Sequence, residues 1–334
     1  MENPTSSHVT GAVPPPEPAP DTIAMATRRP SADKKISLFR LLLKDRFATL
    51  AAIVLVFVGL VAIFGPMFMD DMANEQNLSA TNRPPFSLDA GWEFFLGSDS
   101  LGRSVLARLV TAAQTTLSVA VPTVIVSLVI GSLLGVFAGY HRGWREVTLM
   151  RLADIIMSFP SLLLAVVVLY VFRPSVANIV LVLAITRIPV YLRTARAESA
   201  ELQSRTFVDA ARTFGAGSTK IIGRHIVPVV LPTLLTLATL EFCYVMLAES
   251  SLSFLGIGIQ PPDVSWGLMV AQGRQYLQTA WWLSFFPGLA IVITTVAANM
   301  LAAWLRIATD PAQRWRLSLP RKRFIARVRV TEVH

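Results

Sequence analysis

Long apolar runs separated by short polar connections occupy most of the chain between residues 47 and 305. A bilayer core is about 30 Å thick, so a helix needs roughly 20 mostly apolar residues to cross it. Six runs are close to that length or longer. They cover residues 47–69, 111–139, 155–172, 176–192, 229–254 and 283–305. The pattern therefore predicts an all-α membrane protein with six transmembrane helices.

The basic residues indicate how these helices are oriented. With the N-terminus inside, five of the 30 Lys and Arg residues fall outside: Arg83, Arg103, Arg108, Arg173 and Arg274. The others fall inside, and we assign Arg187 to the inner connection after the fourth run. Because Lys and Arg are concentrated in cytoplasmic loops, we predict that both termini are cytoplasmic. The same rule accounts for the net charge of +9, so we expect membrane lipid around the chain and no nucleic acid as a partner.

Composition and polarity divide the chain into five parts. Residues 1–35 are rich in Pro, Ser, Thr and Ala and bury too little apolar surface to fold, so we expect a disordered cytoplasmic tail. The first helix lies within residues 36–85, and an extracytoplasmic loop follows at 86–110. A transmembrane unit covers 111–306, and a basic cytoplasmic tail covers 307–334.

The inner connection at residues 193–228 has the pattern of a short helix that ends in a turn. Thr206 is placed to cap the first turn of this helix, and the residues that follow favour a helix up to Phe214. The candidate functional residues here are Asp209, Ala210, Ala211, Gly215 and Pro228. On spacing alone, an ordinary amphipathic loop explains the pattern as well as a docking helix does.

This order of residues resembles the EAA loop of binding-protein-dependent ABC importers, with Asp in place of the first Glu. Other stretches resemble the C-type permease of dipeptide and oligopeptide systems. They are LGSDSLGRSVLARL at 96–109, MRLADIIMSFPSLLLA at 150–165, AESSLSFLGIGIQPPDVSWGLMV at 248–270 and FFPGLAI at 285–291. The chain departs from the family pattern at Ser104, where an acid is usual, and at Ala302-Ala303, which replace a Gly-Asp pair.

The resemblance implies a type I ABC importer fold similar to that of the methionine importer. It implies ATP-driven import by alternating access across the bacterial inner membrane. It also implies a B-type partner permease, two ABC ATPase subunits and an extracytoplasmic substrate-binding protein. Loop 193–228 would couple the chain to an ATPase subunit. ATP and Mg would be bound by those subunits, with no cofactor in this chain. Dipeptides or oligopeptides are the implied substrates, although relatives also carry nickel or glutathione.

Two carboxylates fall within the fifth apolar run. Glu241 and Glu249 are eight positions apart, about 80° around a helix, so both fit on one side of it. Acids inside a membrane usually face the bundle interior or water. One interpretation places both on the translocation path. The other, which the sequence favours for Glu249, is local pairing at the outer interface.

The remaining motifs point to structure more than to chemistry. Gly131, Gly135 and Gly139 form a small-residue stripe that suits close helix contact, with a subunit interface as one location. The single cysteine, Cys243, lies in an apolar run, where packing is its expected role. GAGSTK at 215–220 lacks the spacing of a phosphate-binding loop, and we expect no catalytic set. An ion-gradient-driven secondary transporter remains the alternative, although we find one central acid and no internal repeat.

Overall fold

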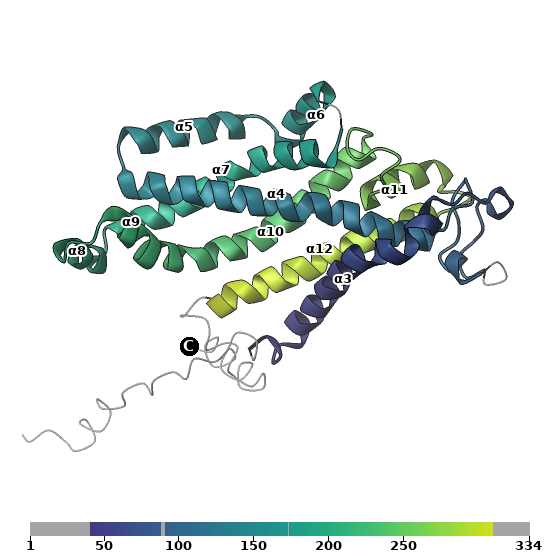
Figure 1. Cartoon of the computed structure of the whole chain (residues 1–334), viewed down its shortest axis with the longest axis horizontal. Helices are drawn as coiled ribbons and strands as arrows, with labels where there is room; N and C mark the ends of the chain where they lie inside the picture. The colour runs from purple at the N-terminus through teal and green to yellow at the C-terminus, as the bar shows by residue number, and fades with distance from the viewer. Residues whose placement is uncertain (1–40, 88–90, 173, 310–334) are drawn as a thin grey trace, which may run out of the picture.

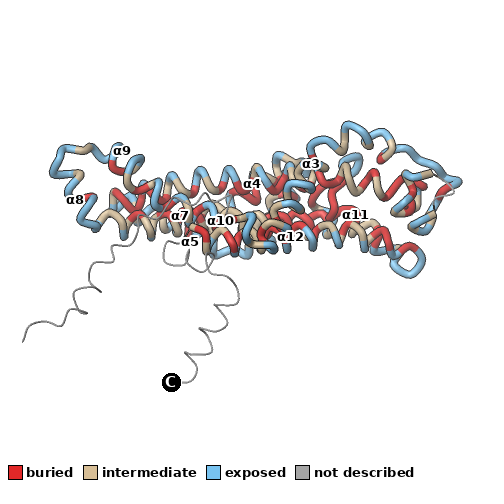
Figure 2. Tube along the Cα trace, turned by 90° about the horizontal axis from the view of Figure 1, so that it is seen from below, coloured by how far each residue is buried: buried red, intermediate tan, exposed pale blue. Residues whose placement is uncertain are grey.

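A computed structural model of the chain describes residues 41–87, 91–172 and 174–309, which form an elongated bundle of helices (Figures 1 and 2). Five segments are helical and apolar for long enough to cross a membrane. They are α3 (Arg46–Asn74), α4 (Val105–His141), α7 (Val176–Gln203), the continuous segment Ser218–Phe254, and α12 (Trp282–Thr309). The tail predicted at 1–35 and nearly all of that at 307–334 lie outside the described residues.

The third predicted span, residues 155–172, is wrong as a single helix. The structure has α5 (Trp144–Ser158) and α6 (Ser161–Val171), with a bend of 84° between them. Phe159 adopts an extended conformation with ψ of 138°, as expected for a residue before a proline, and Pro160 has no N–H to continue the helix. The 11 residues of α6 reach about 17 Å, too short to cross a bilayer alone.

The connection predicted at 193–228 is more helical than expected. α7 continues to Gln203, and α8 (Thr206–Thr213) follows after a short turn. The segment Ser218–Phe254 then begins with α9 (Ser218–Ile221), passes through one π-helical turn, η4 (Ile222–Ile226), and continues as α10 (Val227–Phe254). α8 and α9 lie together at one end of the bundle (Figure 1), which we call the α8 end.

The opposite end of the bundle is built from short elements and loops (Figure 1). They are η1 (Leu78–Ala80), η3 (Trp92–Phe94), α11 (Trp266–Gly273) and η5 (Arg274–Tyr276). Two indole N–H groups fasten this end: Trp282 donates to the Ser98 carbonyl at 3.1 Å, and Trp266 donates to the Leu109 carbonyl at 3.0 Å. We call it the α11 end.

The closest helix pair is α4 with α7, and the glycine stripe is the reason. A Cβ atom added at Gly131, Gly135 or Gly139 would lie only 2.6–2.9 Å from the Cβ atom of Tyr191, Ala195 or Ser199, respectively. The paired residues ascend together in number, so the two helices run parallel. The predicted close contact is therefore confirmed, but it lies within the chain and not at a subunit interface.

Small and large residues lie on different faces of α3. Its buried residues are all alanines, and they face α4 and α12. Large side chains such as Phe57 and Ile63 are exposed, as expected for a helix with one face toward lipid. Near the start of α3, Ala48 packs with Trp304 and Ala308 near the end of α12. The beginning and the end of the helical bundle therefore meet.

Cys243 lies in α10 and faces α12. It is buried, and its Sγ atom lies 3.5 Å from the carbonyl oxygen of Thr295. The packing role predicted for this residue is confirmed.

A valine in place of Gly135 should destabilise the bundle, because its side chain would overlap the Leu192 carbonyl oxygen and Ala195. We expect a loss of about 1–3 kcal/mol of unfolding free energy, typical of overpacking. Thermal unfolding of the detergent-solubilised protein measures it. Gly59→Val is the matched control, because nothing lies within 4 Å of an added Cβ there. Equal melting temperatures for the two variants would contradict the assigned helix contact.

Candidate functional site

The predicted docking helix is present as α8, but it begins differently from the prediction. Its N-cap is Arg205, and no side chain caps the first turn, so the capping role of Thr206 is wrong. Its C-terminus follows the prediction. Gly215 has a φ of +79°, which glycine adopts without a steric cost. The N–H of Ala216 then donates to the carbonyl of Ala211 at 3.0 Å and closes the turn.

α8 is attached to the bundle by one face and exposes the rest. Val208 is fully buried in a cluster with Tyr140, Ile221 and Ile226. The remaining residues of α8 are exposed or half-buried, and Phe214 just after it is 90% exposed. Phe207 of α8 is exposed as well and lies beside Phe214. Two neighbouring aromatic side chains give this end of the bundle an apolar surface, and contiguous surfaces of this kind mark contact sites.

A shallow hollow of about 460 Å³ lies beside α8. Its lining residues are Phe207, Ala210, Ala211, Phe214, Gly215, Ala216, Gly217, Lys220 and His225. Three of the five predicted residues therefore meet there. Asp209 instead forms an exposed ion pair with Arg212 at 3.4 Å, which contributes little to stability. Pro228 is separate: it lies in the first turn of α10 and lines another hollow, which Thr309 at the end of α12 also lines.

Glu241 has a partner that the sequence analysis misplaced. Arg187 does not lie in a loop: it lies within α7, and its Nη1 is 3.6 Å from Glu241 Oε2. Its guanidinium also stacks on the ring of Tyr244 at 4.1 Å. The hydroxyl of Tyr244 lies 2.6 Å from that of Ser161, the first residue of α6. A basic residue inside an apolar run was the signal for this cluster, because a charge there requires a partner.

The cluster around Arg187 is incompletely hydrogen-bonded. Arg187 Nε, Glu241 Oε2 and the hydroxyl of Tyr191 are buried and have no hydrogen-bond partner in the described part of the chain. Buried polar atoms of this kind are costly. Glu241 Oε2 therefore has the charge of Arg187 beside it but no hydrogen bond, and Arg187 Nε and the Tyr191 hydroxyl have none either.

Glu249 is fully buried and has different neighbours. It accepts a hydrogen bond from Ser253 at 2.8 Å and one from Ser250 at 3.4 Å. Ser265, just before α11, lies close to this carboxylate as well. The two carboxylates of α10 therefore do not form one site: Glu241 pairs with α7, and Glu249 pairs with serines toward the α11 end.

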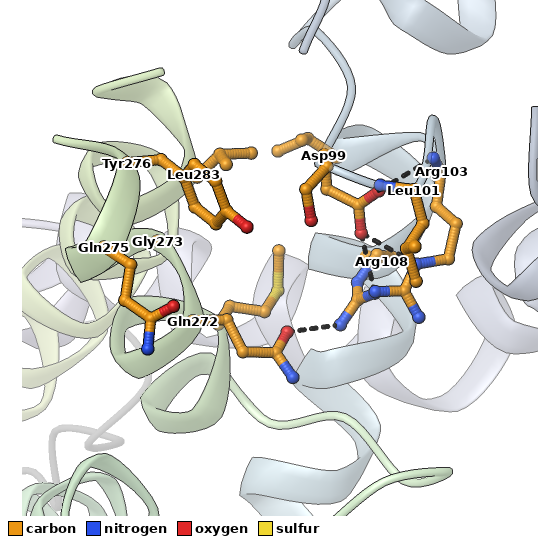
Figure 3. A pocket seen from close by; sticks show the side chains of 12 residues that line it. Asp99, Leu101, Arg103, Arg108, Gln272, Gly273, Gln275, Tyr276 and Leu283 are labelled. Atoms are coloured by element: carbon orange, nitrogen blue, oxygen red, sulfur yellow. Dashed lines mark hydrogen bonds and ion pairs between the residues drawn. The ribbon is translucent and has the colours of Figure 1, made fainter. Parts of the chain in front are cut away.

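A cavity of about 320 Å³ lies at the α11 end (Figure 3). On one side of it, Asp99 accepts hydrogen bonds from Arg103 Nε at 2.7 Å and from Arg108 Nη1 at 3.0 Å. Arg108 Nη2 donates in turn to Gln272 Oε1 of α11 at 2.9 Å. The sequence analysis did not identify this cluster as a site, because Gln272 lies far from the other residues along the chain.

Comparisons with known proteins agree over most of the chain. A family model described as the binding-protein-dependent transport system inner membrane component matches residues 131–315. A second model, the N-terminal TM domain of oligopeptide transport permease C, matches residues 37–85.

Relatives with assigned names are similar along nearly their whole length. The di/tripeptide transport system permease protein DppC of Pseudomonas aeruginosa is 38% identical over 75% of this chain and 83% of its own. The dipeptide permease DppC of Alkalihalophilus pseudofirmus is 34% identical over 82% and 88%. The glutathione permease GsiD of Pectobacterium atrosepticum is 33% identical over 82% and 89%.

Among solved structures, the inward-facing MetNI methionine ABC transporter matches with a TM-score of 0.51 and 19% identity. The match covers 60% of this chain and 96% of that one. It supports the predicted type I importer fold.

Replacing Arg187 with Leu should strongly destabilise the protein, because it leaves Glu241 buried without its cation. Loss of one partner from a buried ion pair costs about 3–5 kcal/mol, whereas an apolar replacement of both is close to neutral. We therefore expect the double variant Arg187→Leu/Glu241→Leu to recover most of the melting temperature that the single variant loses. Additive losses in this double-mutant cycle would show that the two side chains are not coupled.

Proposed function

Because the chain belongs to the family of binding-protein-dependent transport system inner membrane components, and within it to the C type of peptide permease, we propose that it is the permease subunit of an ATP-driven importer. It is an integral membrane protein, and its proposed location is the bacterial inner membrane. With a B-type partner permease it forms the translocation path. Two ABC ATPase subunits and an extracytoplasmic binding protein complete the proposed complex.

The exposed surface of α8 carries this proposal. Val208 fixes the helix to the end of the bundle, while Ala210 and Ala211 leave a low surface that another protein can approach closely. Phe214 projects beside them and has no apolar cover in the described chain. A cleft in an ATPase subunit that receives Phe214 would remove this large apolar side chain from water, which favours association.

The proposed orientation places the α8 end in the cytoplasm. Basic residues are frequent there and include Arg205, Arg212, Lys220 and Arg224, as expected on the cytoplasmic side. The ends of the described bundle at Ala48 and Ala308 meet, which supports placing both termini on one side. ATP and Mg are then bound by the ATPase subunits, next to α8, and this chain needs no cofactor.

The proposed transport cycle is alternating access. ATP binding draws the ATPase subunits together, and α8 transmits this movement through α7 and through the helix that continues into α10. Arg187 and Glu241 lie on these two helices, so their separation would change with the movement. We propose that this pair lies on or beside the path of a small peptide, whose ends and amide groups can bond to the atoms of the pair that have no hydrogen bond.

An ion-gradient-driven secondary transporter is the alternative, and Arg187–Glu241 is the kind of buried pair it would use. A secondary transporter, however, does not require a separate helix with an exposed aromatic residue at the α8 end. Requirement for an ATPase subunit therefore distinguishes the two functions.

Isolation of the tagged chain from mildly solubilised membranes tests the proposal. We expect two ATPase subunits to co-purify with the native chain and to be lost with Gly215→Asp/Ala211→Glu. The first substitution strains the positive-φ turn, and the second adds a charged arm to the proposed contact surface. Arg145→Glu is the matched control: it changes the net charge by the same amount at an exposed position on α5.

Two results would count against the proposal. If the native chain never carries an ATPase, even when its neighbouring subunits are co-expressed, the ion-driven alternative gains support. If both variants lose the ATPases equally, charge and not the α8 surface governs the association.

A further inference from the structure

The cavity at the α11 end has an excess of positive charge. Among the described residues that line it, Asp99 is the only acid, and Arg103 and Arg108 both bond to it. The carboxylate also accepts the backbone N–H groups of Leu101 and Arg103, each at 2.9 Å. Its acceptor capacity is largely used, and one positive charge remains uncompensated beside the cavity.

Arg103 carries the hydrogen-bonding capacity that is left over. Arg108 is 5% exposed, and its two terminal nitrogens are held by Asp99 and Gln272. Arg103 bonds to Asp99 through Nε, and neither of its terminal nitrogens has a partner in the described part of the chain. Its side chain keeps 20% of its surface exposed, so these two donors are available to a ligand.

Uncharged hydrogen-bond donors line the wall of the cavity opposite the arginines. The hydroxyl of Tyr276 points across the cavity toward the Asp99–arginine cluster (Figure 3), and the amide of Gln275 lies on the same side. Unpaired guanidinium nitrogens with neutral donors opposite them form a site for an anion, and the planar fork of Arg matches a carboxylate in particular.

Size and apolar lining narrow the class of ligand. A volume of about 320 Å³ is at the small end of the range for ligand pockets. Leu101, Met269 and Leu283 contribute apolar surface next to the charged cluster. The combination suits a small solute that carries a carboxylate and an apolar side chain, as the C-terminal residue of a short peptide does.

We propose that this cavity is an outer receiving site for the α-carboxylate of a small peptide, with Arg103 as its charged ligand. The site lies at the end of the bundle opposite α8, which is the outer end in the proposed orientation and the side from which substrate arrives. The inference rests on the proposed import of peptides and adds to it a place and a chemical group by which this subunit recognises them.

The test is direct binding to the assembled complex in nanodiscs, prepared without the binding protein and titrated by calorimetry. The probes are trialanine and its C-terminal amide, which differ only in the terminal carboxylate. We expect the native complex to bind trialanine more tightly. Arg103→Gln should weaken trialanine binding about tenfold, the effect of losing one charge-assisted hydrogen bond, and should leave the amide unchanged.

Three further variants separate recognition from a general loss of structure. Arg103→Lys keeps the charge and should retain part of the preference for the carboxylate. Tyr276→Phe should weaken trialanine binding by a smaller factor, because it removes only one neutral donor. Arg274→Gln removes a positive charge from the same outer segment, but Arg274 stacks on Phe254 and does not line the cavity, so it should change nothing.

Equal binding of trialanine and its amide by the native complex would overturn the proposal, as would equal effects of Arg103→Gln on both. An acidic side chain of the binding protein is the other possible source of a carboxylate. The affinity of the complex for the peptide-free binding protein, measured for the same variants, tests for it. If Arg103→Gln weakens only that affinity, an acidic side chain of the binding protein occupies the cavity, and the assignment to substrate is wrong. A failure of the proposed import function would give a different result, because the native chain would then purify without ATPase subunits.

Discussion

The parallel approach of α4 and α7 is the constraint on which the positions of the other elements depend. Three glycines let the two backbones meet, so that their ends are fixed relative to each other. α4 begins at the cavity of the α11 end with Val105 and Arg108. At its other end, Tyr140 packs into the cluster that holds α8. One helix therefore connects the two ends of the bundle, and α7 places Arg187 between them.

Charged side chains inside the bundle differ in how completely they are hydrogen-bonded. Asp99 is surrounded by donors at 2.7–3.0 Å, and this well-bonded cluster fixes the loop before α4 against α11. Arg187 Nη1 and Glu241 Oε2 are 3.6 Å apart, an ion pair without a hydrogen bond, and Arg187 Nε is buried without a hydrogen-bond partner in the described part of the chain. The first arrangement holds the loop rigidly and still leaves the terminal nitrogens of Arg103 without a partner among the described residues. The second leaves polar atoms without hydrogen bonds within the membrane-crossing part, where such atoms are costly.

Most of the fold could be predicted from the sequence, because apolar length and the glycine stripe are local signals. The short helix at Thr206 and the turn at Gly215 were equally local. The predictions were wrong where two local signals in the sequence disagreed. Pro160 divided a run that hydrophobicity alone joined, and a count of basic residues placed Arg187 in a loop although it lies in an apolar stretch. Arg187, a charge in an apolar run, indicated that a partner was needed, but not that the partner is Glu241. The cavity between Asp99 and Gln272 depends on a contact between distant segments, for which a single sequence has no signal.

The burial of Cys243 has a practical consequence for studying this protein. It is the only cysteine in the chain, and its thiol is enclosed between α10 and α12. Thiol reagents attack accessible thiolates and leave buried, apolar cysteines largely unmodified. The natural sequence thus already provides a low-background scaffold for site-directed labelling. A cysteine introduced at an exposed position such as Phe214 would carry a spin label or fluorophore without prior removal of the native one.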